Sequence, residues 1–203
     1  MDTTFRALAW PVAAMTAIVV ASNVLVQHPF PYFGLADYLT WGAFTYPVSF
    51  LVTDLTNRRH GVGMARKLVA VGFVVAVALS VLLATPRIAV ASGTAFLVGQ
   101  LLDVTVFDRL RRHSWWQAPL IGSVVGSALD TALFFSIAFA GDAEMSGAVP
   151  FAGLGSVPLW VSLALCDFAV KMLIALLALI PYGALLRVVQ PAGASPGLPP
   201  RAA

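Results

Sequence analysis

Long apolar runs separated by short polar turns extend over most of the chain. A helix that crosses a bilayer needs about 20 mostly apolar residues, and six of the runs approach or exceed this length. The pattern therefore predicts an all-α integral membrane protein built as a six-transmembrane-helix bundle. The expected spans are residues 7–26, 41–57, 67–84, 87–110, 116–140 and 157–189.

Three of the prolines in or next to these spans affect where a helix starts or bends. The second span is short and contains Pro47, whereas Pro86 precedes the fourth, where a helix start tolerates proline. Pro181 is expected to kink the last third of the sixth span. The first run follows a charged start at Arg6, as in a signal peptide. Because it is long and no convincing small-residue cleavage site follows it, we predict a retained helix.

Two segments outside the spans have a distinct composition. Residues 27–40 are rich in proline and aromatic residues, which is typical of a re-entrant or an interfacial piece. Residues 190–203 are rich in proline, glycine and alanine and are expected to form a disordered cytoplasmic tail. Residues 1–189 are therefore expected to form a single transmembrane domain.

Composition supports a membrane protein independently of the pattern. Hydrophobic residues make up 60% of the chain and charged residues only 10%, with a mean hydropathy of +0.89. An ordinary soluble domain is about 25% charged. The single cysteine, Cys166, excludes an intramolecular disulfide and is expected to be a small apolar residue in a helix.

The distribution of lysine and arginine predicts the orientation in the membrane, because cytoplasmic loops carry an excess of both. Every second loop is basic, whereas the opposite loops carry His28 and Asp37, then no ionisable residue, then Asp142 and Glu144. The basic positions are Arg6, Arg58, Arg59, Arg66, Lys67, Arg109, Arg111, Arg112, Arg187 and Arg201. Both termini are therefore predicted to be cytoplasmic.

Few ionisable residues lie within the spans, and a charge at the bilayer centre costs at least about 2.5–3.5 kcal/mol. Asp54 has Arg58 four residues later, which favours a structural ion pair. Asp167 and Lys171 have the same spacing near the middle of the last span. They could neutralise each other for insertion or exchange partners when a substrate arrives, and both interpretations stay open.

Asp130 differs from the other acids because no basic residue lies within one helical turn of it. Gly122 and Gly126 precede it with a spacing that allows close helix packing, inside the bundle or between subunits. We favour a carboxylate that reads a ligand at the midplane, and the alternative is a carboxylate held by Lys171 or by serine hydroxyls. Gln100 and Asp103 share one face of the fourth span.

The motifs of common enzyme classes are absent from the sequence. We find no G-x-S-x-G, H-E-x-x-H or Walker motif, and all three histidines fall in predicted loops. A carrier fits better than an enzyme. A carboxylate at Asp130 with amides at Gln100 and Asn23 would suit the edge of a guanine-like base, on which aromatic rings stack. This chemistry does not choose between a purine and a vitamin.

Several motifs resemble the queuosine precursor transporter family, also called the vitamin uptake transporter family. They are "SNVLVQ", "TWGAFTYPVSFLVTDLTNRRHG", "GQLLDVTVFDRLRR", "WWQAP", "GSALDTALFFSIAF" and "CDFAVKMLIALLALIPYG". The resemblance implies six helices in the bacterial inner membrane and uptake of 7-deazaguanine bases, 7-cyano-7-deazaguanine or 7-aminomethyl-7-deazaguanine. Ser127 departs from the asparagine that is frequent in the family, which puts one substrate hydrogen bond in doubt. The motif "LIPYG" is also one residue shorter than the common pattern.

We therefore predict an inner-membrane importer that brings in these bases for tRNA queuosine modification. Asp130 would accept the guanine-edge donors, Gln100 and Asn23 would orient the base, and Lys171 with Asp167 would neutralise the empty pocket. Asp103 is a further candidate, and the candidates for a stacking face are Trp41, Phe44 and Phe134.

Three matters stay open from the sequence. The chain could instead be a substrate-binding subunit that needs a separate ATP-driven module, since Ala13, Ala17 and Ala21 repeat every four residues on the first span. An intramembrane enzyme is the third and least favoured hypothesis. The energy source and a homodimer are undecided, and we expect the lipid bilayer as a partner but no cofactor, no metal and no nucleic acid.

Overall fold

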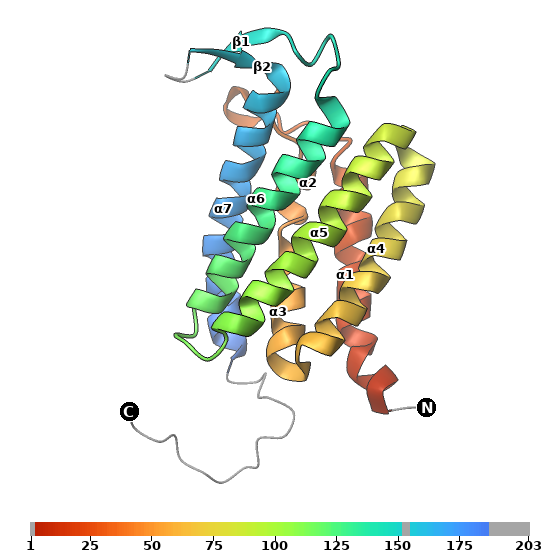
Figure 1. Cartoon of the computed structure of the whole chain (residues 1–203), viewed down its shortest axis with the longest axis vertical. Helices are drawn as coiled ribbons and strands as arrows, with labels where there is room; N and C mark the ends of the chain where they lie inside the picture. Colours follow the sequence, from red (N-terminus) through yellow and green to blue (C-terminus); the bar gives the residue numbers. More distant parts are fainter. Residues whose placement is uncertain (1–2, 152–154, 187–203) are drawn as a thin grey trace.

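The computed structural model describes residues 3–151 and 155–186 and is almost entirely helical (Figure 1). The predicted tail, residues 190–203, and the predicted end of the last span at residues 187–189 lie outside the described residues. The elements are α1 Thr3–Leu25, η1 Tyr32–Gly34, α2 Gly42–Thr45, α3 Val48–His60, α4 Val62–Leu83, α5 Pro86–Leu110, α6 Gln117–Phe139, β1 Ala148–Pro150, β2 Ser156–Pro158 and α7 Leu159–Leu185.

Within the described residues, five helices are long and apolar enough to cross a membrane, namely α1, α4, α5, α6 and α7. The prediction of one continuous helix over residues 41–57 is wrong, because the chain forms α2 and α3 with a break at Tyr46 and Pro47. Proline has no backbone N–H and its ring collides with the preceding turn, so a helix breaks or kinks there. With 13 residues, α3 is too short to span a bilayer alone.

The connections between helices also differ from the predicted ones at two places. The helix α4 begins at Val62 and not at residue 67, because Gly61 alone separates it from α3. Gly61 has φ of 83°, a left-handed conformation that glycine adopts without strain, so the two helices reverse direction over one residue. An antiparallel pair of short strands, β1 and β2, connects α6 to α7 and was not predicted.

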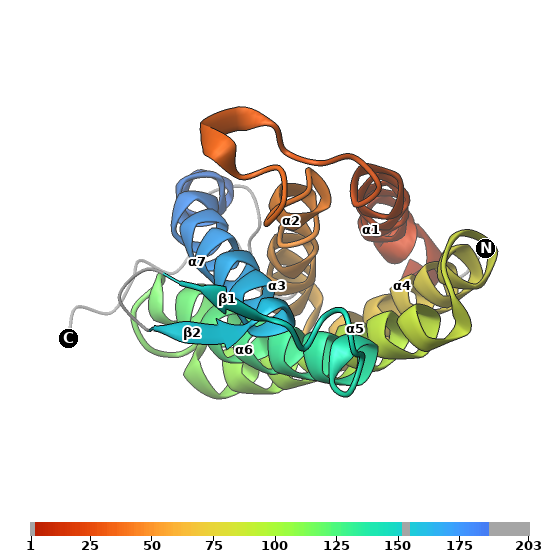
Figure 2. The ribbon, with the colours of Figure 1, turned by 90° about the horizontal axis from the view of Figure 1, so that it is seen from above.

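The aromatic segment 27–40 lies at one end of the bundle. Pro29 and Thr40 form a β-bridge, and no residue of the short helix η1 is buried. Seen from above, the segment arches from the end of α1 across α2 toward α7 (Figure 2). Phe33 is 91% exposed at the turn. Of the two alternatives, this placement agrees with an interfacial piece and not with a re-entrant one.

The short helix α3 is central to the bundle. It contacts all five long helices, and in Figure 2 it lies between α1 on one side and α7 on the other. One side of α3 is buried and largely polar, with Ser49, Thr53, Asp54 and Asn57 among the residues that it turns inward. The most polar helix of the structure is therefore the one that all others surround.

Basic residues gather at one end of the bundle. The α3–α4 turn, the α5–α6 turn, the start of α1 and the end of α7 all lie at this end (Figure 1). Arg87 is at the opposite end, where its guanidinium donates to the carbonyl oxygens of Ile137, at 2.8 Å, and Ala140, at 2.6 Å. These carbonyls end α6, and a cation at a helix C-terminus is favoured by the helix dipole.

The glycine spacing of α6 serves a contact inside the chain. A Cβ atom at Gly126 would lie 2.9 Å from the Gly99 carbonyl oxygen of α5, and one at Gly99 would lie 2.9 Å from the Asp130 Cβ atom. A Cβ atom at Gly122 would lie only 2.5 Å from the Asp103 Oδ1 atom. Small residues therefore let the backbones of α5 and α6 touch.

We predict that Gly126→Ala lowers the free energy of unfolding by about 1–3 kcal/mol, the usual cost of overpacking. The added methyl group meets backbone, which cannot move aside as a flexible side chain would. Thermal unfolding of the purified protein in detergent gives the change as a lower Tm. Gly63→Ala is the control, because a Cβ atom there has no neighbour within 4 Å. Equal melting of Gly126→Ala and wild type would contradict the close contact.

Candidate functional site

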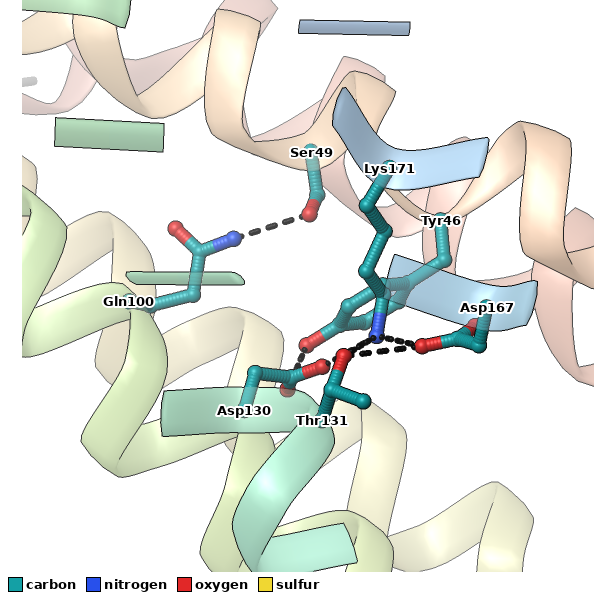
Figure 3. A network of polar contacts seen from close by, with 7 residues as sticks. All are labelled: Tyr46, Ser49, Gln100, Asp130, Thr131, Asp167 and Lys171. Atoms are coloured by element: carbon teal, nitrogen blue, oxygen red, sulfur yellow. Dashed lines mark hydrogen bonds and ion pairs between the residues drawn. The ribbon is translucent and has the colours of Figure 1, made fainter. Parts of the chain in front are cut away.

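A buried lysine connects α7 to α6 at the centre of the bundle (Figure 3). The Lys171 Nζ atom lies 2.7 Å from Asp130 Oδ2, 2.5 Å from Asp167 Oδ2 and 2.9 Å from Thr131 Oγ1. An ammonium group has three N–H donors, and these three oxygens take one each. The Thr131 hydroxyl in turn donates to Asp167 Oδ2, at 2.9 Å.

Tyr46 completes this network from the break between α2 and α3. Its hydroxyl donates to Asp130 Oδ1 at 2.8 Å, so both oxygens of Asp130 have a partner. The Lys171 ammonium also lies 5.4 Å from the centre of the Tyr46 ring, a cation–π distance. We call Tyr46, Asp130, Thr131, Asp167 and Lys171 the lysine network.

Burial makes this network energetically sensitive. Asp130 is 3% exposed and Lys171 is 4% exposed, so both are removed from water. A buried ion pair stabilises little in itself, but removal of one partner leaves an uncompensated charge and typically costs about 3–5 kcal/mol. With all groups ionised, two carboxylates and one ammonium carry a net charge of −1. Both oxygens of Asp130 already have a donor, so a ligand that binds Asp130 must replace a donor and not add one.

Gln100 forms a second buried cluster next to the first. Its Nε2 atom donates to Ser49 Oγ at 2.8 Å, and its Oε1 atom accepts from Thr53 Oγ1 at 2.8 Å. The preceding residue, Gly99, packs against Asp130, so the amide lies beside the lysine network (Figure 3). The predicted proximity of Gln100 and Asp130 is thus present in the structure.

Asp54 and Asp103 lie in a third buried cluster, outside the hydrogen bonds of the lysine network. The predicted ion pair of Asp54 with Arg58 is not formed, which corrects the sequence interpretation. The Arg58 guanidinium instead donates to the Arg111 carbonyl oxygen at 2.7 Å. Arg111 caps the end of α5, where carbonyls lack helical partners and attract such a donor.

The other predicted residues are apart from the lysine network. Asn23 donates through Nδ2 to the Val19 carbonyl oxygen at 2.9 Å and accepts from Ser80 Oγ at 3.5 Å, between α1 and α4. Trp41 and Phe44 pack on Phe30, and their ring centres lie 4.9 and 4.8 Å, respectively, from the ring centre of Phe30.

Phe134 also makes an aromatic contact of its own, with Phe135, at 5.1 Å between ring centres. In the described part of the chain, the side chains of Asn23, Trp41, Phe44 and Phe134 form no hydrogen bond and no ring contact with the side chains of the lysine network. In the same part of the chain, no three His, Cys, Asp or Glu side chains gather as a metal site.

A narrow cavity extends from Lys171 toward the basic end of the bundle, between α3, α6 and α7. The volume of this cavity is about 10 Å³, which is enough for about one water molecule. Its lining combines polar and apolar side chains from the three helices, among them Phe50, Asp54, Ser123, Ser127, Lys171 and Tyr182.

Sequence reasoning missed four polar residues of the site. Tyr46, Ser49 and Thr53 follow one another at intervals of three and four residues in "TYPVSFLVT", which places them on one helical face. This spacing was a usable signal, because an apolar span with a hydroxyl stripe turns that stripe inward. Thr131 directly follows Asp130 and had no comparable signal.

Comparisons with known proteins agree on the family. A family model described as "Putative vitamin uptake transporter" matches residues 40–84 and 79–185. The Haemophilus influenzae "Probable queuosine precursor transporter" is 37% identical over 91% of this chain and 88% of its own length. The Escherichia coli "Queuosine precursor transporter" is 34% identical over 91% of this chain and 89% of its own length. The Bacillus subtilis "Probable queuosine precursor transporter" is 25% identical over 80% of this chain and 77% of its own length.

No solved structure matches the chain. The relatives are named transporters, which confirms the prediction of a transporter and not an enzyme, and the five apolar helices fit a multi-pass membrane protein. With matches over nine tenths of its length, the chain belongs to the queuosine precursor transporter family.

Proposed function

We propose that this protein imports 7-deazaguanine precursors of queuosine across the bacterial inner membrane, with 7-cyano-7-deazaguanine as the main cargo and 7-aminomethyl-7-deazaguanine as the variant. The names of the relatives support the substrate class. The observation that carries the proposal is a fully buried carboxylate, Asp130, held by a lysine and a tyrosine beside a buried amide, Gln100. In this proposal α2 and α3 together cross the membrane once, which adds one crossing to those of the five long helices. The basic end of the bundle and both termini face the cytoplasm.

Recognition follows from an exchange of donors at Asp130. The edge of a deazaguanine presents adjacent N–H groups, and a carboxylate accepts both at once. These donors would replace Tyr46 at Oδ1 and Lys171 at Oδ2, while Lys171 keeps Asp167 and Thr131. The ammonium stays paired with Asp167, and the two N–H donors of the base take the place of the two donors that Asp130 gives up.

Gln100 and the aromatic residues would fix the orientation of the base. The Gln100 Nε2 atom, which donates to Ser49 Oγ in the structure, would donate instead to the carbonyl oxygen of the base. The ring of Tyr46 lies at the network and is the nearest stacking candidate. Trp41 and Phe44 belong to the aromatic group at the end opposite the basic turns, so in this proposal they receive the base at the outer mouth.

Transport requires the helices around the network to separate. The cavity beside Lys171 has space for about one water, whereas a deazaguanine has two fused rings. The helices α3 and α7 both line this cavity, and α3 is joined to α2 at a proline break. We therefore propose that α3 moves relative to α7 to admit the base.

We predict that Asp130→Asn weakens binding of 7-cyano-7-deazaguanine about 10- to 100-fold, since one hydrogen bond to a charged group contributes about 1.5–3 kcal/mol. The amide retains the size of the side chain but accepts through one oxygen. Equilibrium binding to purified protein measures the change. A deazapurine without the exocyclic amino group serves as ligand control, because it should distinguish the two proteins less. Undiminished affinity of Asp130→Asn would exclude the assignment.

We predict that Lys171→Met destabilises the protein by about 3–5 kcal/mol, because two buried carboxylates lose their cation. Thermal unfolding in detergent measures the loss. Addition of Asp167→Asn to this variant should recover part of the stability, since it removes one of the stranded charges. If Lys171→Met melted at the wild-type temperature, the network would not be the structural centre described here.

A substrate-binding subunit of an ATP-driven transporter is the second candidate. Ala13 and Ala17 are exposed on the outer side of α1, where a small-residue face could receive another helix. We predict that the chain acts alone: purified protein in liposomes should exchange external labelled 7-cyano-7-deazaguanine for internal unlabelled base. Empty liposomes are the control. Exchange that appears only after an ATP-hydrolysing module is added would support the second candidate instead.

A further inference from the structure

The buried polar atoms that lack a hydrogen-bond partner in the described part of the chain come from four residues at one place in the bundle. They lie on α3, α5 and α7, on the basic side of the lysine network. The atoms are Asp54 Oδ1, Asn57 Oδ1, Asp103 Oδ1, Asp103 Oδ2 and the hydroxyl oxygen of Tyr182. Buried polar atoms are almost always paired in native proteins, and four of these five atoms are carboxylate or amide oxygens that can only accept, so they point to a missing donor.

The geometry brings the two carboxyl groups together. Asp54 is 2% exposed and Asp103 is fully buried, and their side chains lie within hydrogen-bonding range of each other. Asn57, one turn after Asp54, is fixed beside them by its bond to the Val104 carbonyl oxygen at 3.0 Å. The Asp103 carboxyl group fits against Gly122 of α6, where any Cβ atom would meet Oδ1.

No described cation neutralises this acid pair. On α3, Arg58 is committed to the Arg111 carbonyl oxygen. On α7, Lys171 gives its three donors to the lysine network, and Tyr182 is neutral. The face of α6 offers Gly122, Ser123 and Gly126, while Arg66 and Lys67 of α4 are exposed. Arg109, toward the end of α5, is exposed as well.

Two ionised carboxylates cannot share such a place. Isolated buried charges carry a large desolvation cost, and two like charges in contact add repulsion. Both groups are hydrogen-bond acceptors until one of them holds a proton, and a single proton supplies the donor that the pair lacks. Two coupled carboxyl groups then titrate as one site.

We propose that Asp54 and Asp103 together bind the proton that drives import, one proton entering with each neutral base. The inference rests on the proposed import function and adds its energy source. The proton reaches the pair while the outer side is open and leaves through the cavity that Asp54 and Tyr182 line. The step breaks one O–H bond at the pair and forms one O–H bond on water at the cytoplasmic side.

Release of the proton would also explain how the cytoplasmic end opens. The pair then carries a second negative charge, and Arg58 is four residues from Asp54, at ion-pair spacing. To reach Asp54, the guanidinium must leave the Arg111 carbonyl oxygen, which now joins α3 to the α5–α6 turn. Proton release and separation of α3 from that turn are therefore one event.

The experiment uses purified full-length protein in liposomes, with labelled 7-cyano-7-deazaguanine and a pH-sensitive dye inside. An alkaline interior should make wild-type protein accumulate the base up to about tenfold per pH unit of gradient, as expected for one proton per base. The dye should report acidification that depends on added base. Asp54→Asn should lose both effects while it still exchanges labelled for unlabelled base at equal pH. Asp103→Asn should also lose base-dependent acidification.

Asp108→Asn is the matched control, because Asp108 also lies on α5 but forms a partly exposed ion pair with Arg111, at 3.4 Å. It should accumulate the base like the wild type. Infrared spectra give a second readout that does not require transport: a protonated carboxyl band in the wild type should be lost in Asp54→Asn and in Asp103→Asn.

The outcomes separate the two proposals. Wild-type exchange without any response to the gradient would overturn the proton site and leave import intact. Absence of exchange by the wild type would overturn import itself. Gradient-driven accumulation by Asp54→Asn, or a wild-type spectrum without the carboxyl band, would show that the proton is not held by this pair.

Discussion

An ammonium group buried among apolar helices is stable only while each of its protons has an acceptor and each acceptor has a donor. Lys171 meets this condition through Asp130, Asp167 and Thr131, and Tyr46 satisfies the remaining oxygen of Asp130. Three parts of the chain are thereby tied together, namely α6, α7 and the break between α2 and α3. The same condition makes the network a site of recognition, since a ligand enters it only by offering equivalent donors.

The fold serves this condition in two ways. Glycines on α5 and α6 let the two backbones touch, which brings Asp130 and Asp103 of neighbouring helices close to the bundle centre. The proline break before α3 allows a short polar helix to lie among five apolar ones. Its inward side then supplies Ser49 and Thr53 to Gln100, and Asp54 to the acid pair. A continuous apolar helix at this position could supply neither cluster.

The sequence predicted the features that depend on local pattern. Apolar runs located the five long helices, and the absence of a nearby base singled out Asp130, with Lys171 as one of the partners in the less favoured, structural interpretation. Contacts between distant segments were harder to foresee. The Asp54–Arg58 spacing suggested an ion pair, but a carbonyl at the end of α5 captures the arginine, and this carbonyl is remote in the sequence.

The break at Pro47 and the role of Tyr46 depend on the same kind of long-range packing. The sequence places Pro47 inside the second apolar run. A proline there is compatible with a kinked helix or with two separate helices, and tertiary contacts decide between the two. Asn23 and the aromatic candidates were chosen by chemistry alone, and chemistry does not tell which helices face each other. Their contacts with substrate stay predictions.

The central claim is that cargo displaces Lys171 from Asp130. A structure of the protein with 7-cyano-7-deazaguanine bound tests it most directly, through the distance between Lys171 Nζ and Asp130 Oδ2, now 2.7 Å. The account predicts that this distance lengthens beyond hydrogen-bonding range, with the N–H edge of the base on the Asp130 carboxylate and Lys171 still on Asp167. A bound base elsewhere in the bundle, with the Lys171–Asp130 pair intact, would contradict it.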